Sequence, residues 1–260
     1  MPTHGFYDID PADGTARWTI GIVATNPEEL AVCVERLRAA GFSRDDTTLL
    51  VVRNFGQNHL DCFAAITRFL EDAQGRRLIV LHQDVSPLEE AAALWTALEA
   101  LDERDPDWAL AGNAGYRGLM RPVWRISDPH DTDARIGDPP QSVLSLDENL
   151  LILNLKNPVR PSSGLTGFHF YGTDLCLAAA EAGRRAYVLD WLVRHDSQGS
   201  RNTSWRAGIA MMERHWGPRL GHRILPTPTA FLLFGLFRVL RPIRHKLYGA
   251  LWRIERRIWW

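Results

Sequence analysis

Short aliphatic runs alternate with amphipathic stretches over the first third of the chain. Three of these runs have the length and composition of buried strands: 18–24, 48–52 and 78–85. Asn26 and Pro27 have the residue types of a helix N-cap and first helical position, and a second apolar helical face covers 63–70. The order strand, helix, strand, helix, strand predicts parallel strands joined by right-handed crossovers, and therefore an α/β fold.

The rest of the chain predicts further helices and strands. We expect a helix over 89–101, a strand and glycine-rich turn over 108–115, and a loop over 122–140. Within 143–155 we expect a turn that joins a strand to a second strand or to the start of a helix, and a loop follows over 157–165. The last expected elements are a helix after Gly172, a strand over 186–193, and a helix over 202–216 that ends at Gly217-Pro218. The expected organisation is an irregular lead-in over 1–17, one α/β domain over 18–217 and a helical tail over 218–260.

Composition narrows the class of protein. With 260 residues, 45% hydrophobic and 23% charged, the chain has the profile of a soluble globular domain. Three widely spaced cysteines with apolar neighbours (Cys33, Cys62 and Cys176) argue against a disulfide framework and a zinc site, and suit a reducing compartment. The acidic first 14 residues do not resemble a signal peptide, so we expect a cytoplasmic location.

Charge is unevenly distributed along the chain. Residues 230–260 carry seven Lys/Arg and one Glu, a balance of +6, so a net charge of −1 leaves −7 on the rest. No stripe of basic residues in the body indicates nucleic-acid binding. In the tail, Ile243, Leu247, Leu251, Ile254 and Ile258 recur at helical spacing beside four arginines. Three tryptophans of the kind that favours a membrane interface accompany them: Trp252, Trp259 and Trp260.

The pattern of the tail predicts a basic amphipathic helix that lies on the anionic inner face of the cytoplasmic membrane. The alternative is a helix packed on the body of the protein or on a second subunit. The longest apolar run, 230–237, is too short to span a bilayer.

Polar residues follow all three predicted parallel strands: Thr25 and Asn26, then Asn54, then His82, Gln83 and Asp84. Because the carboxyl ends of such strands meet at one edge of the sheet, these side chains predict a pocket. Asp84 is a candidate ligand for a divalent cation that holds a diphosphate, although it could instead cap the next helix. The chain lacks a glycine-rich dinucleotide fingerprint and a P-loop motif.

Three later stretches add candidate site residues. Gly112 and Asn113 lie in a glycine-rich turn where the backbone could approach a ligand, or that could simply be tight. Asp174, beside the aromatic residues His169 and Tyr171, is either a general base at a pocket rim or a plain first-turn acid of a helix. His195, at a strand end, is a candidate third metal ligand or a structural histidine.

The strand ending HQDV, the GNAG stretch, the motif GFHFYGTDLCLAA and the strand ending VRH occur in this order over about 18–199. The chain resembles the family-2-like glycosyltransferases of GT-A fold, and is most similar to the subgroup whose strand ends in HQDV and whose later motif is roughly fHFYdxDlcL. The resemblance implies a Rossmann-type mixed sheet. It also implies transfer of a sugar from a nucleoside-diphosphate donor to a hydroxyl acceptor, with Mn²⁺ or Mg²⁺ and, in the commonest form, with inversion.

The resemblance also implies roles for individual residues. Asp84 stands at the position that binds metal and diphosphate, in place of a full DxD triplet, and His195 matches a late metal-binding histidine. Asp174 stands at the position of the catalytic base, and Thr25, Asn26 and Asn54, with Gln83, fall at strand ends that hold the donor nucleotide. The chain departs from the pattern at three positions, because Asn54, Gly172 and Thr173 replace common acids.

Two other classes of function compete with a metal-dependent glycosyltransferase. A non-catalytic protein that binds a nucleotide-sugar or serves as a scaffold would explain the missing acids. A nucleotidyltransferase can share metal carboxylates at strand ends, but it would need a basic, glycine-rich phosphate loop after the first strand, which this chain lacks.

Overall fold

The computed structural model describes residues 5–129, 131–197 and 201–259. The first third of the chain forms the β-α-β-α-β unit expected from the sequence. Its elements are β2 Trp18–Ala24, α1 Pro27–Ala39, β3 Thr47–Arg53, α2 Cys62–Asp72 and β4 Arg77–Leu81. Strand β2 pairs in parallel with both β3 and β4, which confirms the predicted parallel arrangement. Asn26 is the N-cap of α1, and its side chain accepts hydrogen bonds from the backbone N–H groups of Glu28 and Glu29.

Five further strands complete an eight-stranded mixed sheet of order β1-β3-β2-β4-β12-β6-β13-β10. They are β1 Tyr7–Asp10, β6 Trp108–Gly112, β10 Gln141–Val143, β12 Leu150–Asn154 and β13 Arg185–Val188. Strand β12 is antiparallel to both of its neighbours, whereas β13 is parallel to β6. The expectation of an irregular lead-in is therefore wrong for Tyr7–Asp10, because these residues pair with β3 and bury Tyr7.

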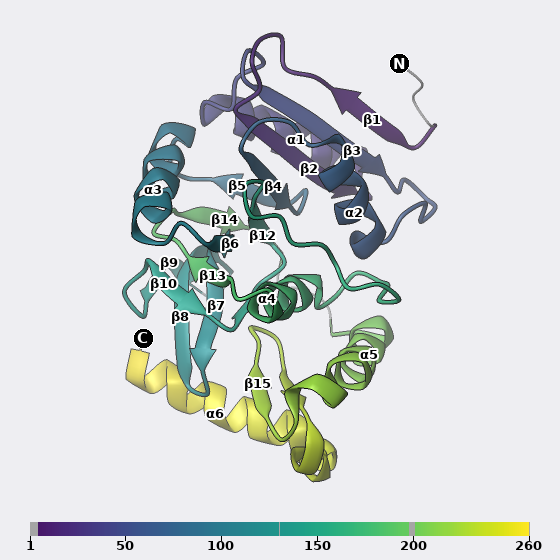
Figure 1. The fold of residues 1–260 in the computed structure, drawn as a ribbon, viewed down its shortest axis with the longest axis vertical. Coiled ribbons are helices and arrows are strands. Elements are labelled where there is room, and N and C mark those ends of the chain that lie inside the picture. Colours follow the sequence, from purple (N-terminus) through teal and green to yellow (C-terminus); the bar gives the residue numbers. More distant parts are fainter. Residues whose placement is uncertain (1–4, 130, 198–200, 260) are drawn as a thin grey trace.

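Helices cover both faces of this sheet, so the mixed α/β class is confirmed. One hydrophobic core lies beneath α2 and α4 (Tyr171–Glu181), and a second lies beneath α1 and α3 (Ala91–Arg104). Figure 1 shows α3 and α4 on opposite sides of the strands. The N-cap of α3 is Glu90, so the alternative in which Asp84 caps this helix is wrong.

A second sheet stands against the first and has the order β11-β7-β8-β14-β5, with β9 added on β8. Its strands are β5 Val85–Pro87, β7 Ala114–Gly118, β8 Arg121–Asp128, β9 Asp131–Ile136, β11 Ser145–Leu146 and β14 Val193–His195. The predicted loop over 122–140 is wrong, because most of it is the β8–β9 hairpin. Its buried residues come in adjacent pairs, Pro122 with Val123 and Ile126 with Ser127, so both faces of β8 are partly covered and the strand lacks a simple polar–apolar alternation.

The C-terminal part packs on this body. Helix α5 (Thr203–Leu220) continues past the expected end at Gly217-Pro218. Then come the hairpin of β15 (Ile224–Pro226) and β16 (Phe231–Leu233), the 3₁₀ helix η1 (Gly235–Ile243) and α6 (Arg244–Trp259). Tyr248 and Glu255 of α6 are buried, and Glu255 accepts a hydrogen bond of 2.8 Å from the hydroxyl of Tyr116 on β7.

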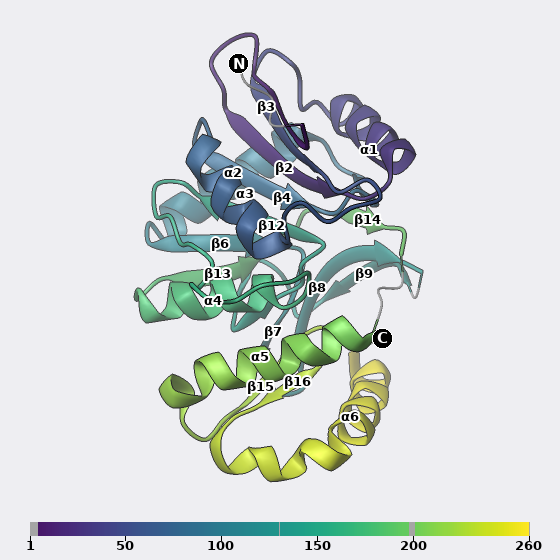
Figure 2. The same ribbon diagram turned by 90° about the vertical axis from the view of Figure 1, so that its right-hand side faces the viewer.

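The inward face of α6 therefore rests on the protein, as in the alternative reading of the tail, and Figure 2 shows α5, the hairpin and α6 grouped at one end of the molecule. The predicted interfacial role of Trp260 and of the Trp259 side chain lies outside the described residues. No helix in the described part of the chain combines the length and apolarity needed to cross a bilayer.

Candidate functional site

Three potential metal ligands come together where β4 ends. His82, Asp84 and His195 each offer one ligand atom, and these atoms all lie within 4.8 Å of one another. The backbone N–H of Val85 donates to the carbonyl of His82, which turns the chain back after β4, and β5 then pairs with β14 so that Val85 faces His195. As a result, His195 Nε2 lies 3.5 Å from Asp84 Oδ2, and His82 Nδ1 lies 4.0 Å from Asp84 Oδ1.

The electrostatics of this cluster keep Asp84 ionised. Burial alone would raise the pKa of Asp84, but hydrogen bonds from His195 and Ser197, together with the nearby histidines, lower it below its usual range. Burial would lower the pKa of His195, and the bond to Asp84 raises it above the ordinary value instead. The pKa of His82 is lowered by burial and by the neighbouring His195. A divalent cation needs an ionised carboxylate and neutral imidazoles, so Asp84 and His82 already suit it, whereas the raised pKa of His195 means that a cation must compete with its proton.

Tyr171 orients the His82 ring. Its hydroxyl donates to the carbonyl of Glu148 at 3.0 Å and lies 2.8 Å from His82 Nε2. Because the hydroxyl has only one proton, it accepts from Nε2–H, and the lone pair of neutral His82 is then on Nδ1, which faces Asp84. This is the arrangement in which metal-binding histidines are held by a partner on the other ring nitrogen. Tyr171 is buried and supports the cluster from behind rather than lying at a pocket rim.

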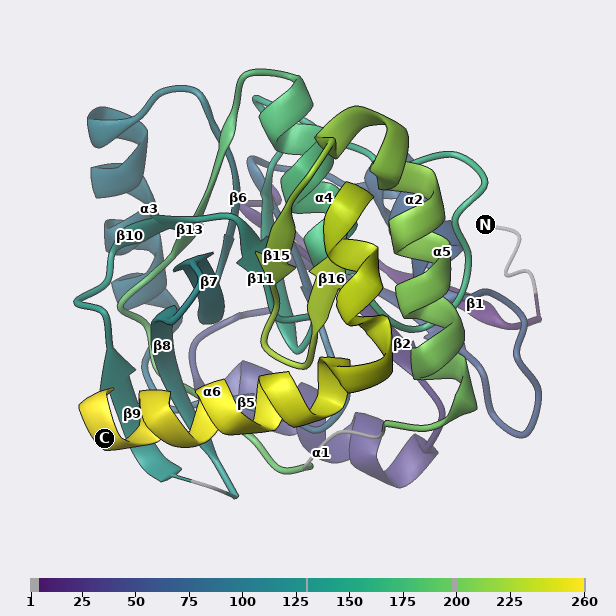
Figure 3. The ribbon, with the colours of Figure 1, turned by 90° about the horizontal axis from the view of Figure 1, so that it is seen from below.

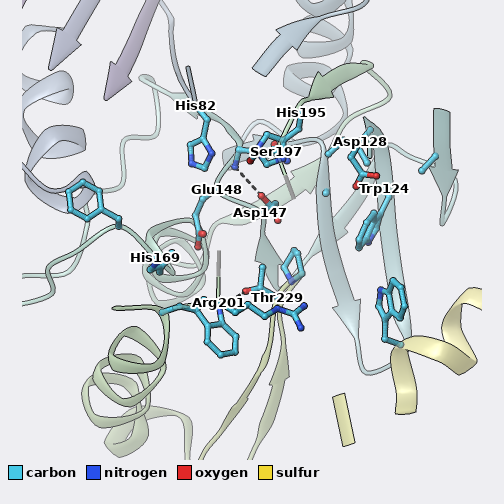
Figure 4. A pocket seen from close by; sticks show the side chains of 18 of the residues that line it. His82, Trp124, Asp128, Asp147, Glu148, His169, His195, Ser197, Arg201 and Thr229 are labelled. Atoms are coloured by element: carbon cyan, nitrogen blue, oxygen red, sulfur yellow. Dashed lines mark hydrogen bonds between the residues drawn. The ribbon is translucent and has the colours of Figure 1, made fainter. Parts of the chain in front are cut away.

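A cavity of about 260 Å³ adjoins the cluster, and His82 and His195 form part of its wall. Asp147 and Glu148, in the turn before β12, lie between these histidines and the basic and aromatic far wall, as Figure 4 shows. His169 also lines this cavity, as expected of a rim residue. Residues from β8, from α5 and the segment just before it, and from α6 complete the far wall: Trp124, Asp128, Arg201, Trp205, Trp252 and Arg256.

Glu148, which lines the cavity, is a candidate general base. Burial, and then the charge of Asp147, raise the pKa of Glu148 well above its ordinary value. The carboxylate of Asp147 instead accepts a hydrogen bond of 3.0 Å from the backbone N–H of Asn149. A carboxylate with a raised pKa is a stronger base toward a hydroxyl group, so Glu148 is the better candidate of the two.

The expected position of Asp174 at a pocket rim is wrong. Asp174 does lie in the first turn of α4, but its side chain is 0% exposed. It accepts hydrogen bonds from the backbone N–H of Ser162 at 2.7 Å and from Trp216 Nε1 at 2.9 Å. Burial raises the pKa of Asp174, and the buried carboxyl group is out of reach of an acceptor substrate. Asp174 therefore joins the 157–165 loop and α5 to α4, and has a structural role.

The expected donor-binding residues divide into two groups. Gln83 Oε1 accepts from the backbone N–H groups of Thr25 and Asn26 at 2.8 and 3.1 Å, so the ends of β2 and β4 do meet. Asn54 is buried and closes its own loop through the backbone of His59 and Leu60. None of the four side chains lines the cavity beside the metal cluster.

Gly112 and Asn113 lie where β6 turns into β7. A Cβ on Gly112 would lie 2.9 Å from the carbonyl oxygen of Leu150, so this glycine permits close strand packing. The Asn113 side chain is buried and has no hydrogen-bond partner among the described residues, although the adjacent Ala114 lines the cavity. Because buried amides rarely remain unpaired, Asn113 is a candidate to bind water or a polar ligand group.

Sequence reasoning missed several cavity residues. Asp147 and Glu148 follow one strand and precede another, so they read as a turn, although two adjacent acids at a strand end were an available signal. Trp124 and Asp128 fell in the stretch read as a loop. Arg201, Trp252 and Arg256 reach the cavity only because the C-terminal segment folds back on the body.

No family model matches the sequence. The chain is 32% identical over 222 residues to the protein named ATP synthase subunits region ORF 6 of Fuscovulum blasticum, across 82% of this chain and 89% of the relative. This chain belongs to the same family as that protein. Among solved structures, A197 from STIV is 17% identical, with a TM-score of 0.40 over 84% of this chain and 94% of that one.

Proposed function

We propose that this protein is a metal-dependent glycosyltransferase of GT-A type that moves a sugar from a nucleoside-diphosphate donor to a hydroxyl acceptor. The observation that carries the proposal is the juxtaposition of two features: the His82, Asp84 and His195 cluster at a strand end, and a cavity containing Glu148. Ligand sites of open α/β sheets lie at this edge. The resemblance of the HQDV and HFYGTDLCL motifs to family-2-like glycosyltransferases supports the same conclusion.

The donor set favours Mn²⁺ over Mg²⁺. Two imidazoles and one carboxylate suit first-row transition metals, whereas Mg²⁺ prefers oxygen ligands and keeps several waters. The bound cation would neutralise charge on the diphosphate as it leaves. His82 thus takes the position of the first acid in a DxD triplet, and Tyr171 holds its ring.

The acceptor hydroxyl would lie in the cavity against Glu148. Glu148 takes the hydroxyl proton while the acceptor oxygen attacks the anomeric carbon, and the bond from that carbon to the diphosphate oxygen breaks, so the diphosphate leaves with the electron pair. A single displacement of this kind inverts the anomeric carbon. Trp124, Trp205 and Trp252 provide apolar and aromatic surface against which sugar rings can stack.

A panel of UDP-, GDP- and dTDP-sugars with Mn²⁺ tests the proposal by measuring release of the nucleoside diphosphate. We expect release from at least one donor, and loss of at least about 100-fold in kcat for Glu148→Gln with donor binding retained. Glu181→Gln, a change to an exposed acid at the end of α4, is the matched control. Full turnover by Glu148→Gln would remove Glu148 from the mechanism.

A second candidate is a non-catalytic protein of the same fold that binds a nucleotide-sugar. Two observations favour it: Asp174 is sealed in the core, and Asn54 is occupied by its own loop. Donor-dependent thermal stabilisation without nucleoside diphosphate release, with any acceptor, would establish this candidate instead.

A further inference from the structure

The 3₁₀ helix η1 exposes a row of large aliphatic side chains. Leu236 is 74% exposed and Val239 77%, and because a 3₁₀ helix has three residues per turn these two lie on one side of the element; Ile243, at its C-terminal end, is 49% exposed. Ile254 and Ile258 are also exposed on α6, which follows directly. Single exposed aliphatic residues are common on protein surfaces, but a row of them on consecutive elements indicates an interaction site.

Other apolar residues of the tail, unlike this exposed row, pack against the protein. Leu247 and Leu251, which the sequence grouped with the membrane-facing residues, pack instead with Tyr248 against Phe231 and Leu233 of β16. That part of the expectation is wrong, because α6 buries one face on the protein. The face that remains available begins at Leu236, within the 230–260 segment that was expected to contact the membrane.

Cationic side chains flank the exposed row. A cavity of about 360 Å³ between α5 and η1 is lined by Arg214, Arg238 and Arg241. Arg241 donates to the buried carboxylate of Glu213, which anchors η1 to α5. Arg214 and Arg238 are exposed and form no ion pair within the described part of the chain. Two unpaired guanidinium groups at a concave site suit a phosphate group.

The exposed aliphatic row and its flanking arginines lie at one end of the molecule, where a large and flat partner can reach them. In Figure 2, η1 lies at the end of the long axis opposite β1. Figure 3 views this end directly and shows no other element in front of η1 and α6. Residues 230–260 carry +6, whereas the rest of the chain carries −7. A second copy docking through the same surface would bring two such positive segments together, which disfavours a symmetric dimer here.

We propose that the η1 end of the molecule docks on a bilayer containing anionic phospholipid. Leu236, Val239 and Ile243 insert at the boundary between headgroups and acyl chains, and Arg214 and Arg238 bind lipid phosphates. The contact is peripheral, since amphipathic segments of this kind lie in the interface. It combines apolar burial with electrostatic attraction, the two contributions that stable peripheral binding requires. The proposal does not depend on the chemistry of the cavity.

Co-sedimentation with vesicles tests the apolar part of this surface. We expect the full chain to sediment with vesicles of phosphatidylcholine and phosphatidylglycerol at 3:1 and to remain in solution with phosphatidylcholine alone. The triple variant Leu236→Ser, Val239→Ser, Ile243→Ser should bind at least about tenfold more weakly. The matched control is Val32→Ser, Leu88→Ser, Leu119→Ser, which removes three aliphatic side chains of 43%, 51% and 46% exposure elsewhere. Thermal unfolding of each variant shows whether it is folded.

A charge variant tests the phosphate contacts. Arg214→Gln with Arg238→Gln should weaken partition about fivefold per arginine, whereas Arg121→Gln with Arg160→Gln should change it little. Inorganic phosphate at 10 mM should not displace the protein, because a free ion lacks the apolar contribution. The proposal is overturned if the wild-type chain does not bind anionic vesicles, or if the folded triple variant binds them as tightly as the wild type does. It is equally overturned if the wild type is a dimer that the triple variant dissociates.

Discussion

Replacing Asp174 tests whether this carboxylate supports the fold or takes part in catalysis. In Asp174→Ala, the N–H of Ser162 and Nε1–H of Trp216 lose the acceptors that lie 2.7 and 2.9 Å away in the wild type. Each donor left unsatisfied costs about 1–3 kcal/mol, so for two donors we expect a loss of roughly 2–6 kcal/mol in the free energy of unfolding. For a chain of this size, that lowers the Tm by about 5–15 °C.

The conservative variant separates the two roles. Asp174→Asn keeps one acceptor but turns an amide N–H₂ toward one of the two donors, so it should lose about 1–3 kcal/mol. Denaturant unfolding measures this loss directly, and Glu71→Gln on the exposed face of α2 is a control expected to cost less than about 1 kcal/mol. If Asp174→Asn left stability unchanged but abolished turnover, the structural assignment would be refuted and Asp174 would return as the catalytic base.

Three further predictions concern the metal cluster and the cavity. His82→Ala and His195→Ala should each remove Mn²⁺-dependent thermal stabilisation, whereas His59→Ala should keep it; retention in all three would refute the cluster as a metal site. Tyr171→Phe should weaken Mn²⁺ binding about 10- to 100-fold while His82 stays in place, and unchanged affinity in a calorimetric titration would show that the hydroxyl does not orient the ring. Because Glu148 must be unprotonated to accept the hydroxyl proton and its pKa is raised, kcat/KM should fall as pH decreases through that raised pKa; an acidic limb at the ordinary value of a glutamate would contradict this assignment.

Local sequence patterns predicted the fold of the first third of the chain. The apolar runs before Asn26, Asn54 and His82 are strands, and the residue types around Asn26 indicated the start of α1, because strand burial and helix capping depend on neighbours within a few positions. The β8–β9 hairpin was not predicted because β8 buries adjacent pairs of residues rather than alternate ones, and because charges such as Arg125 and Asp133 pair with each other across the hairpin.

The residues of the candidate site are brought together by contacts between segments that are far apart in the sequence. Asp84 and His195 meet only because β5 pairs with β14, more than a hundred residues later. The first turn of α4 was correctly placed, but whether Asp174 faced a cavity or the core was decided by Trp216 on α5. Glu148 follows Asp147 in a turn, and although two adjacent acids were a signal, the sequence does not show that this turn faces a cavity. Sequence reasoning therefore found candidate metal ligands and missed the candidate base.

Nucleoside diphosphate release from a nucleotide-sugar in the presence of Mn²⁺ tests the central claim most directly, namely that the His82, Asp84 and His195 cluster and the Glu148 cavity form one active site. We expect wild-type protein to release the diphosphate in a Mn²⁺-dependent manner from at least one donor, and Asp84→Asn and Glu148→Gln each to reduce kcat at least about 100-fold. Absence of release from every donor, despite demonstrated Mn²⁺ binding, would contradict the claim.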